Sequence, residues 1–217
     1  GMDAGLLMLL AAAQMLVMLT RNIDLSVDAV VGLAAYGAAS SLHLHPELGI
    51  VGGVAIASVV GLTCGILNGL IVAVGRVPSI VVTLGTMSVF RGINSLLAGG
   101  KQVSADQVPQ AWLDFTSGHV LGVPSILLFA VAVFVIAGWI LSRTSFGREF
   151  FAAGSNPDGA RLIGIPVRRI EFYAFAIAGL VAGFTGALWA SRYATIDARV
   201  AYGFELTVIA AVVVGGV

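Results

Sequence analysis

Residues 142–171 read SRTSFGREFFAAGSNPDGARLIGIPVRRIE and form a charged island between two apolar runs. Upstream, residues 121–142 carry no charged side chain over 22 positions, and downstream, residues 173–191 carry none over 19 positions. A helix needs about 20 apolar residues to cross the hydrocarbon core of a bilayer. The island itself holds five of the eleven Lys and Arg residues. This pattern predicts two membrane-spanning helices joined by a basic polar loop.

The composition supports a membrane protein. The chain is 59% hydrophobic and 10% charged, with a mean hydropathy of +1.02, whereas soluble domains are about 25% charged. So few charges cannot cover the whole surface, and we expect much of it to face the lipid bilayer. The net charge is zero, which gives no reason to expect a nucleic-acid partner. The single cysteine, Cys64, lies in an apolar run and has no internal partner for a disulfide.

The remaining uncharged runs complete a set of about seven spans. They cover residues 5–20, 29–42, 49–75 and 78–90, and a last run begins near Glu205. Backbone polar groups find no water in lipid, so helix is the expected conformation of each run. The run 78–90 is short, and Arg91 interrupts it before the sequence GINSLLAGG. We therefore predict an all-α fold, a polytopic transmembrane helical bundle forming one membrane domain over residues 1–217.

The last apolar run, residues 206–217, has 12 residues. As a helix it would reach about 18 Å, against a hydrocarbon core of about 30 Å. We expect the chain to be a fragment of a longer protein, truncated at both ends.

The distribution of Lys and Arg predicts the orientation, because cytoplasmic loops carry an excess of both. Strict alternation of the spans gives a cytoplasmic set of Arg21, Arg76, Arg143, Arg148, Arg161, Arg168 and Arg169. It gives an outer set of Arg91, Lys101, Arg192 and Arg199. The loop 143–171 is therefore cytoplasmic. The polar stretch 99–119 lies outside, where it is either a docking surface for an extracytoplasmic partner or a solvated connector.

The basic loop contains a short helix with clear start and stop signals. Ser155 or Asn156 can cap its N-terminus, and Pro157 suits the first helical position. Gly164 suits a left-handed stop, which gives about two turns over residues 157–163, with Ala160 and Ile163 on one face. Two turns are not stable alone in water, so the protein's own helices or a partner's groove must support them. The alternative is a capped connector that touches nothing.

A second cluster, residues 20–28, reads TRNIDLSVD. Charges at a membrane boundary are costly unless they are paired or hydrated. Asp24 can cap the following helix, Asp28 lies one turn further on, and Arg21 can neutralise one of them. The cluster is either an interfacial turn or part of a polar route through the membrane.

Uncharged polar residues near the short run suggest a solute path. Short or Pro-broken segments often mark transport sites. The set comprises Ser26, Asn68, Thr83, Thr86, Ser88 and Asn94. Neutral hydrogen-bonding groups suit a polyhydroxylated solute better than an ion, although each can also join two helices. Glycines at helical spacing, among them Gly61, Gly65, Gly179 and Gly183, are read as packing seams, with hinges as the alternative.

Several signatures are absent from the sequence. It has no phosphate-binding loop of the form G-x-x-x-x-G-K-[ST], no HExxH and no CxxC. His43 and His45 lack a third ligand, so we predict no metal site. No credible catalytic pair is present, and we expect a non-enzymatic protein without a cofactor of its own.

Four segments resemble the permease subunits of ABC-type monosaccharide importers. They are LTRNIDLSV (19–27), ILNGLIVAVGRVPSIVVTLGTMSVFRGI (66–93), TSFGREFFAAGSNPDGARLIGIPV (144–167) and GFELTVIAAVVVGGV (203–217). The resemblance is to the ribose, xylose and arabinose group, and the RNID wording is closest to its rhamnose and autoinducer-2 members. It implies a multi-pass protein of the bacterial inner membrane with about ten membrane helices.

The resemblance also implies partners. Permeases of this family work as homo- or heterodimers with ABC ATPase subunits, which bind the ATP, and with a periplasmic sugar-binding protein. The family motif G-x-N-x-x-A-A-x-x-x-G-I marks the helix that couples to the ATPase. In this sequence it matches Gly154, Asn156, Gly159, Ala160, Gly164 and Ile165. The resemblance therefore implies that the short helix couples to the ATPase, and the coupling residues we predict in it are Asn156, Pro157, Ala160, Arg161, Ile163 and Gly164. Two positions depart from the family: Gly159 replaces the first Ala, and Asp28 replaces the Gly of I-D-L-S-V-G.

The path residues expected for an importer are Asp24, Ser26, Asn68, Thr83, Thr86 and Asn94. One rival is an ion- or proton-coupled secondary transporter in which Asp24 and Asp28 bind the coupling ion. A second rival is a structural membrane subunit without a solute path.

Overall fold

The computed structural model describes residues 2–120, 122–193 and 195–217, and most of them are helical. The helices are α1 (Met2–Leu19), α2 (Val27–Leu44), α3 (Gly49–Gly69), α4 (Ser79–Ala98), α5 (Gln110–Ser117), α6 (Ser125–Arg143), α7 (Ser145–Ser155), α8 (Pro157–Leu162), α9 (Val167–Tyr193) and α10 (Phe204–Val214). Short 3-10 helices cover Pro46–Leu48 and Ala105–Gln107, and a π-helical turn, Leu70–Val74, extends α3. The strands β1 (His119–Val120) and β2 (Val123–Pro124) pair antiparallel.

The described residues contain five helices long and apolar enough to cross a membrane. They lie at Val27–Leu44, Pro46–Val74, Ser79–Ala98, Ser125–Arg143 and Val167–Tyr193, and shorter apolar helices occupy Asp3–Leu19 and Phe204–Val214. Each apolar run predicted from the sequence thus corresponds to a helix. The prediction of an all-α polytopic bundle is confirmed.

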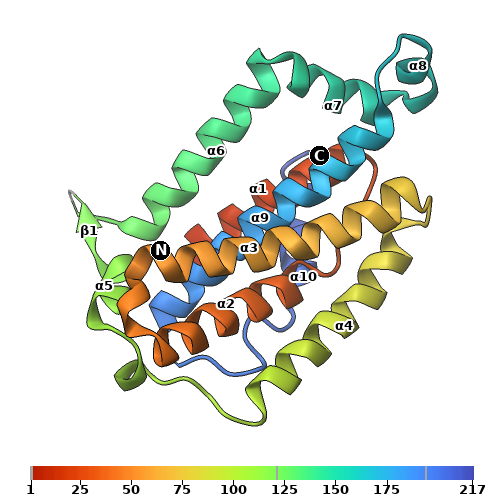
Figure 1. Ribbon diagram of the computed structural model, residues 1–217. Helices are drawn as coiled ribbons and strands as arrows, with labels where there is room; N and C mark the ends of the chain where they lie inside the picture. The colour runs from red at the N-terminus through yellow and green to blue at the C-terminus, as the bar shows by residue number, and fades with distance from the viewer. Residues whose placement is uncertain (1, 121, 194) are drawn as a thin grey trace.

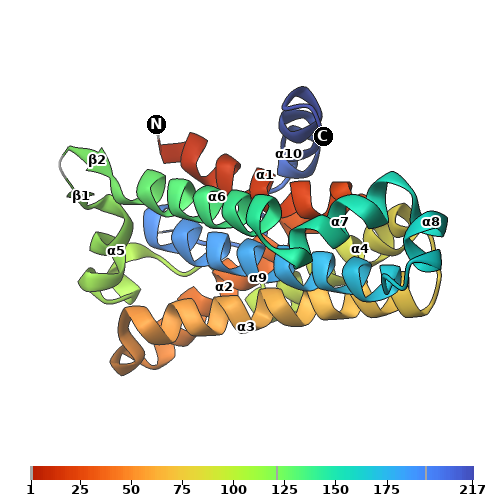
Figure 2. The ribbon, with the colours of Figure 1, turned by 90° about the horizontal axis from the view of Figure 1, so that it is seen from above.

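Helix α9 forms the centre of the bundle, with α1, α2 and α3 alongside it (Figures 1 and 2). Its contact with α3 is the most extensive, and glycines line it on both helices. A Cβ on Gly61 would collide with the backbone of Gly179 and Gly183, and one on Gly65 would meet the Phe175 carbonyl. Small residues that let helix backbones touch are typical of association in lipid. The predicted glycine seam is therefore confirmed.

Helices α4, α6 and α10 are peripheral. Only 22% of the α4 span and 17% of the α6 span are buried, against 61% of the α9 span. Helix α10 projects from the side of the bundle (Figure 2). Their exposed side chains include Val81, Leu96, Val135 and Leu206, which suits surfaces in contact with lipid.

The structure corrects the predicted break at Arg91. Helix α4 runs without interruption from Ser79 to Ala98 and ends where Gly99 adopts φ 54°, a left-handed stop. Arg91 therefore lies within the span and not in an outer loop. The helix tolerates this charge because the guanidinium is paired with a carboxylate on α2, as described below.

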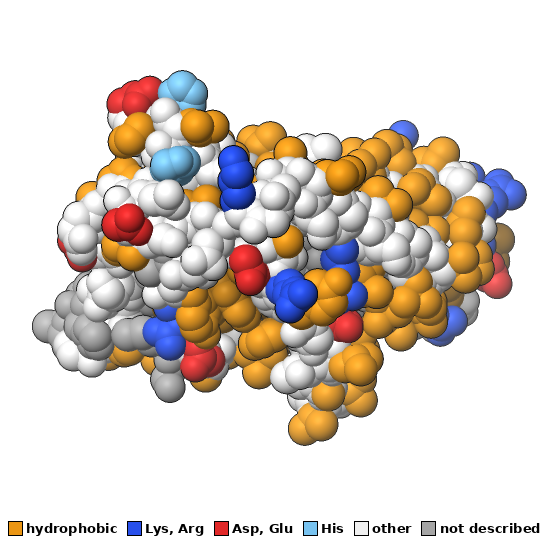
Figure 3. Space-filling view, turned by 90° about the horizontal axis from the view of Figure 1, so that it is seen from below, with side chains coloured by type: hydrophobic (Ala, Val, Ile, Leu, Met, Phe, Trp, Pro, Cys, Tyr) orange, Lys and Arg blue, Asp and Glu red, His pale blue; other side chains and the backbone are white. Residues whose placement is uncertain are grey.

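The predicted cytoplasmic arginines gather at one end, which we call the inner end. Arg21 Nη2 donates to the Ser155 carbonyl at 2.6 Å, so α1 meets the loop after α7. Arg76, Arg161 and Arg168 line a common hollow of about 460 Å³ with Glu171. Basic side chains also stand out at this end, on the right of Figure 3.

The opposite, outer end is closed by the stretch that follows α4. Helix α5 buries Trp112 and Thr116, and Thr116 Oγ1 lies 2.8 Å from Ser191 Oγ of α9. The ring Nδ1 of His43 lies 3.3 Å from the Gln107 carbonyl oxygen. The stretch is thus packed onto the bundle and is not merely a solvated connector, while its role in docking stays a prediction.

We expect Gly61→Ala to destabilise the full-length protein by about 1–3 kcal/mol, because the new methyl group would force α3 away from α9. Gly85→Ala on α4 is the matched control, since a Cβ there meets nothing within 4 Å. Thermal unfolding of the detergent-purified proteins measures both. Equal melting temperatures for the two variants would contradict the seam.

The two ends should also differ in chemical accessibility. In a Cys64→Ser background, we expect Ser155→Cys to react with an impermeant maleimide from the cytoplasm and Leu44→Cys to react from the periplasm. Both native residues are exposed, whereas Cys64 is buried and should be silent in the parent chain. Labelling of both positions from one side would contradict the arrangement of spans, and reversed labelling would contradict the orientation.

Candidate functional site

A non-helical segment, residues 20–26, folds back into the bundle from the inner end. The side-chain amide of Gln14 is oriented so that its nitrogen donates to the Asp24 carbonyl and its oxygen accepts from the Asp24 N–H, each at 3.2 Å. Gln14 lies more than one turn before the end of α1, so the segment runs back alongside that helix. The N–H groups of Ile23 and Leu25 donate to Ser79 Oγ and Thr83 Oγ1 of α4, each at 3.1 Å. Side chains therefore satisfy irregular backbone inside the bundle, as lipid requires.

Asp24, Ser26 and Asn68 form a buried polar cluster at the start of α2. Asp24 Oδ1 accepts from Ser26 N at 2.8 Å and from Ser26 Oγ at 2.7 Å. Asn68 Nδ2 of α3 donates to Ser26 Oγ at 2.8 Å. All three side chains are at most 4% exposed, and Asn68 Oδ1 has no hydrogen-bond partner among the described residues. The cluster thus holds spare hydrogen-bonding capacity in the interior.

The structure refines the predicted cap of α2. Ser26 occupies the N-cap position, but no side chain caps the helix there. Asp24 instead bonds the backbone two residues ahead, which is a turn of the Asx type. The carboxylate therefore shapes the approach to α2 and does not cap it.

A second non-helical segment, residues 195–203, returns from the outer end between α2 and α4. Ile196 pairs with Val103 through two backbone hydrogen bonds of 2.9 Å. Further in, Asn94 Nδ2 of α4 donates to the Ala198 carbonyl at 3.3 Å. The Val200 carbonyl then lies against α2, where Gly32 leaves room for it. The segment ends at Gly203, whose φ of 83° turns the chain into α10.

The two returning segments end near a charged cluster formed by Asp28 of α2, Arg91 of α4 and Glu205 of α10. Arg91 Nη2 pairs with Asp28 Oδ2 and lies 3.8 Å from Glu205 Oε2. The guanidinium also stacks on the Tyr202 ring, 4.0 Å from its centroid. The side chain of Asp28 is 1% exposed, and those of Arg91 and Glu205 are 20% and 17% exposed. We call these four residues the Arg91 cluster.

The expected pairing of Arg21 with Asp24 or Asp28 is wrong. Arg21 is exposed and bonds the Ser155 carbonyl, whereas Asp28 pairs with Arg91. The reason is depth: the returning segment carries Asp28 into the bundle while Arg21 stays at the inner end. Sequence reasoning missed Arg91 and Glu205 as partners. The available signal was a lone ionisable residue, Arg91, within one apolar run and another, Glu205, at the start of the last run.

The residues predicted to line the solute path lie in two regions, one around segment 20–26 and one near segment 195–203. Asp24, Ser26, Asn68 and Thr83 lie together around segment 20–26, joined by Gln14 and Ser79, which sequence reasoning did not select. Thr86 lies one turn after Thr83 and bonds within α4 at 3.4 Å. Asn94 belongs instead with the outer segment. Gln14 was detectable as the lone polar residue in the run 5–19.

The short helix in the basic loop forms as predicted, as α8. Asn156 Oδ1 accepts from Gly159 N at 2.9 Å, and Pro157 takes the first helical position. Gly164 adopts φ 86°, and Ile165 N donates to the Ala160 carbonyl at 3.0 Å, which closes the C-terminus. Gly154, the glycine that precedes this helix, packs against the Leu19 carbonyl of α1, which ties the loop to the bundle.

The expected common face of Ala160 and Ile163 is wrong. The helix ends at Leu162, and Ile163 occupies the C-cap position, where its N–H still donates to the Gly159 carbonyl at 3.3 Å. Ala160 is 3% exposed and packs in the bundle's inner core cluster, whereas Leu162 and Ile163 are 89% and 76% exposed. Arg161 Nη1 donates to Asp158 Oδ1 at 2.9 Å. The protein's own core thus supports α8, which lies at the inner end of the molecule (Figure 1). The exposed Leu162 and Ile163 form an apolar tip at the C-terminal end of this helix.

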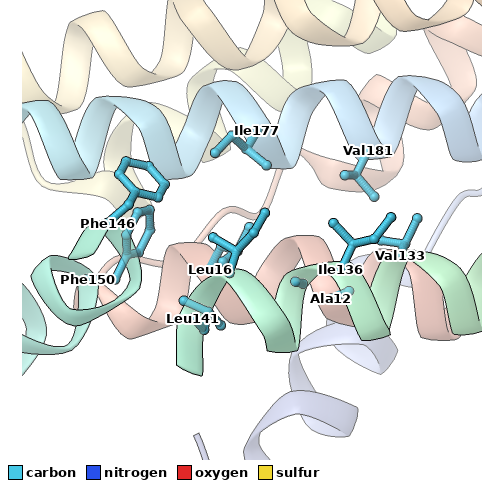
Figure 4. A pocket seen from close by; sticks show the side chains of 11 residues that line it. Ala12, Leu16, Val133, Ile136, Leu141, Phe146, Phe150, Ile177 and Val181 are labelled. Atoms are coloured by element: carbon cyan, nitrogen blue, oxygen red, sulfur yellow. The ribbon is translucent and has the colours of Figure 1, made fainter. Parts of the chain in front are cut away.

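A pocket of about 260 Å³ between α1, α6, α7 and α9 is a poor candidate for a polar site (Figure 4). Its walls carry only hydrocarbon side chains, including Leu16, Ile136, Phe146 and Ile177. It could hold an acyl chain or another apolar group, but it offers no hydrogen bonds from side chains. Within the part of the chain that the structure describes, no three His, Cys, Asp or Glu side chains gather as a metal site.

The role of Thr83 in holding segment 20–26 can be tested directly. We expect Thr83→Val to destabilise the full-length protein by about 1–3 kcal/mol, because the half-buried Leu25 N–H loses its acceptor while the side-chain volume is kept. Thr63→Val is the matched control, since that exposed hydroxyl bonds only its own helix. Melting temperatures in detergent compare the two, and a smaller loss for Thr83→Val would contradict the assigned role.

Comparison with known proteins places the chain in a family. A family profile described as "Branched-chain amino acid transport system / permease component" matches residues 2–217. An "Autoinducer 2 import system permease protein LsrC" of Yersinia pseudotuberculosis is 36% identical over 215 residues, which cover 99% of this chain and 60% of that protein. The protein of the same name from Yersinia pestis is 35% identical over the same shares.

The chain thus spans about 60% of the length of these relatives. No solved structure matches it. The profile match covers nearly the whole chain, and the apolar helices agree with it. The chain therefore belongs to the branched-chain amino acid transport system / permease component family, and it is a multi-pass protein of the bacterial inner membrane.

Proposed function

We propose that the protein is the transmembrane permease subunit of an ATP-driven importer of a monosaccharide or a similar small polyhydroxylated solute. The observation that carries this proposal is the 36% identity to an autoinducer-2 import permease over 99% of the chain. The buried uncharged groups of Ser26, Asn68 and Thr83 support a neutral, hydroxyl-rich solute, because they can donate and accept without demanding a charge. The family profile names branched-chain amino acids, and we take this description to refer to the family as a whole and not to the solute of this chain.

The proposed complex contains ABC ATPase subunits, a second permease subunit and a periplasmic sugar-binding protein. The second permease is either identical or a related chain. ATP is bound and hydrolysed by the ATPase subunits, since this sequence has no phosphate-binding loop. The permease itself is then non-catalytic and needs no cofactor. The packed outer stretch, residues 99–119, is the surface offered to the binding protein.

Helix α8 is the proposed contact with the ATPase, through Asn156, Pro157, Ala160, Arg161, Ile163 and Gly164. Two features support this role: the apolar tip is exposed, and the base of the helix is anchored in the bundle by Ala160. Because α9 begins at Val167, directly after this helix, movement of the tip would act on the central helix. Closure of the ATPases would thus shift the permease pair between inward-open and outward-open states, as population shift requires.

The path proposed for the solute follows Asn94, Thr86, Thr83, Asn68, Ser26 and Asp24 from the outer to the inner end. The rival ion-coupled mechanism gains no specific support. Asp28, one of its two presumed ion ligands, is already paired with Arg91.

We expect Ile163→Asp in the full-length complex to abolish solute-stimulated ATP hydrolysis, because a charge would replace the apolar group that enters the ATPase. Arg161→Glu should have the same effect, while the membrane helices stay folded. Release of phosphate by complexes in proteoliposomes, with and without loaded binding protein, measures the coupling.

Arg148→Glu provides the matched control, because it reverses an exposed charge on α7 in the same loop. It should leave stimulation largely intact. Full stimulation in the Ile163→Asp and Arg161→Glu complexes would rule out α8 as the coupling element. Uptake that needs an ion gradient and no ATP would contradict the importer itself.

A further inference from the structure

The Arg91 cluster lies where the two returning segments meet, inside the bundle. Its members come from three helices and one segment: Asp28 opens α2, Arg91 lies in the second half of α4, Tyr202 ends segment 195–203, and Glu205 opens α10. Acidic and basic side chains also gather around the base of the projecting α10 in Figure 3. Ionisable side chains at such depth are expensive and are mostly functional.

The cluster contains more hydrogen-bonding capacity than it uses. Arg91 pairs with Asp28 through Nη2, but its Nε is buried and has no partner among the described residues. Glu205 Oε2 is likewise buried without a hydrogen bond, since 3.8 Å from Nη2 exceeds hydrogen-bond length. An ion pair retained only for stability would be expected to satisfy these atoms, because each costs free energy when it is left unpaired. The spare donor and acceptor point to a ligand that completes them.

The charges of the cluster favour a neutral ligand that can both donate and accept hydrogen bonds. One guanidinium faces two carboxylates, so the two carboxylates would repel a further anion, and the guanidinium would repel a cation placed beside it. A vicinal diol donates hydroxyl protons to a carboxylate and accepts from a guanidinium through its oxygens. Tyr202 adds an aromatic face at 4.0 Å from the guanidinium and is 57% exposed, which leaves an open side for the C–H face of a sugar ring.

We propose that Asp28, Arg91, Glu205 and Tyr202 form a solute-contact site that selects small polyhydroxylated solutes by a pair of adjacent hydroxyl groups. Arg91 donates to the hydroxyl oxygens, Glu205 accepts a hydroxyl proton, and Asp28 holds the guanidinium in place. This assignment rests on the proposed importer function and adds a second contact to the Asp24–Asn68 group. It also gives a role to Asp28, which replaces a glycine of the family motif.

The test measures selectivity, because a merely structural ion pair would not change it. The full-length complex with its ATPases and binding protein is reconstituted in proteoliposomes. ATP-driven uptake is measured for labelled pentoses and 6-deoxyhexoses and, for each transported sugar, for an analogue that lacks one hydroxyl of a vicinal pair. We expect the wild-type complex to favour the parent sugar, and Glu205→Gln to lower this rate ratio at least about fivefold, since a lost hydroxyl contact is discriminated by such factors.

Tyr202→Ala is the second variant, because its exposed ring can be removed with little risk to folding. It should lower the uptake of every sugar. Glu47→Gln is the control, an exposed carboxylate at the outer end that should keep the wild-type ratio.

The outcomes separate the two proposals. Unchanged rate ratios in Glu205→Gln, with unchanged uptake in Tyr202→Ala, would overturn the solute-contact site and leave the importer standing. A wild-type complex that takes up none of these sugars with ATP would overturn the importer and this assignment with it. A lowered ratio in Glu205→Gln but not in Glu47→Gln supports the assignment.

Discussion

The structure depends on satisfying irregular backbone inside a membrane bundle. Residues 20–26 and 195–203 are not helical, yet they run among helices where water is scarce, so each polar backbone group needs a partner. Ser79 and Thr83 of α4 accept from the inner segment, while Val103 and Asn94 bond the outer one. These bonds also fix the position of α4, which has little buried surface to hold it by packing alone. Polar side chains on one helix thus determine where two segments, distant in sequence, can meet.

The glycine seam gives the bundle a second kind of order. Between α3 and α9 the backbones approach so closely that no side chain could be added at Gly61 or Gly179. Lipid offers no hydrophobic driving force between helices, so close packing of this kind supplies the attraction. The pair then forms the firm centre, and the sparsely buried α4, α6 and α10 surround it. In the proposed mechanism α8 pushes on the firm part through α9, while the peripheral helices that carry Arg91 and Glu205 are free to change their separation.

Much of this fold follows from local sequence signals. Charge-free runs mark the helices because burial in lipid excludes charge, and Asn156, Pro157 and Gly164 define α8 through interactions within a few residues. The main failures depend on contacts between residues that are distant in sequence. Arg91 was expected to break a helix because its partner, Asp28, lies 63 residues away in sequence. Ile163 was expected to share a face with Ala160, but only Ala160 packs against core residues of the other helices.

The difference between local and long-range interactions also explains why only part of the candidate site could be predicted from the sequence. The neutral residues around Asp24 could be selected because each is polar within an apolar run. The members of the Arg91 cluster could not be recognised as partners in the same way. A single Asp28, Arg91 or Glu205 at this depth would be costly, and each is tolerated only because the other charges lie beside it. The apolar pocket between α1, α6, α7 and α9 offers no polar side chain, so it cannot relieve that cost. The charges are therefore placed where hydrogen-bonding capacity is left over, and a passing polar solute is the partner best able to use it.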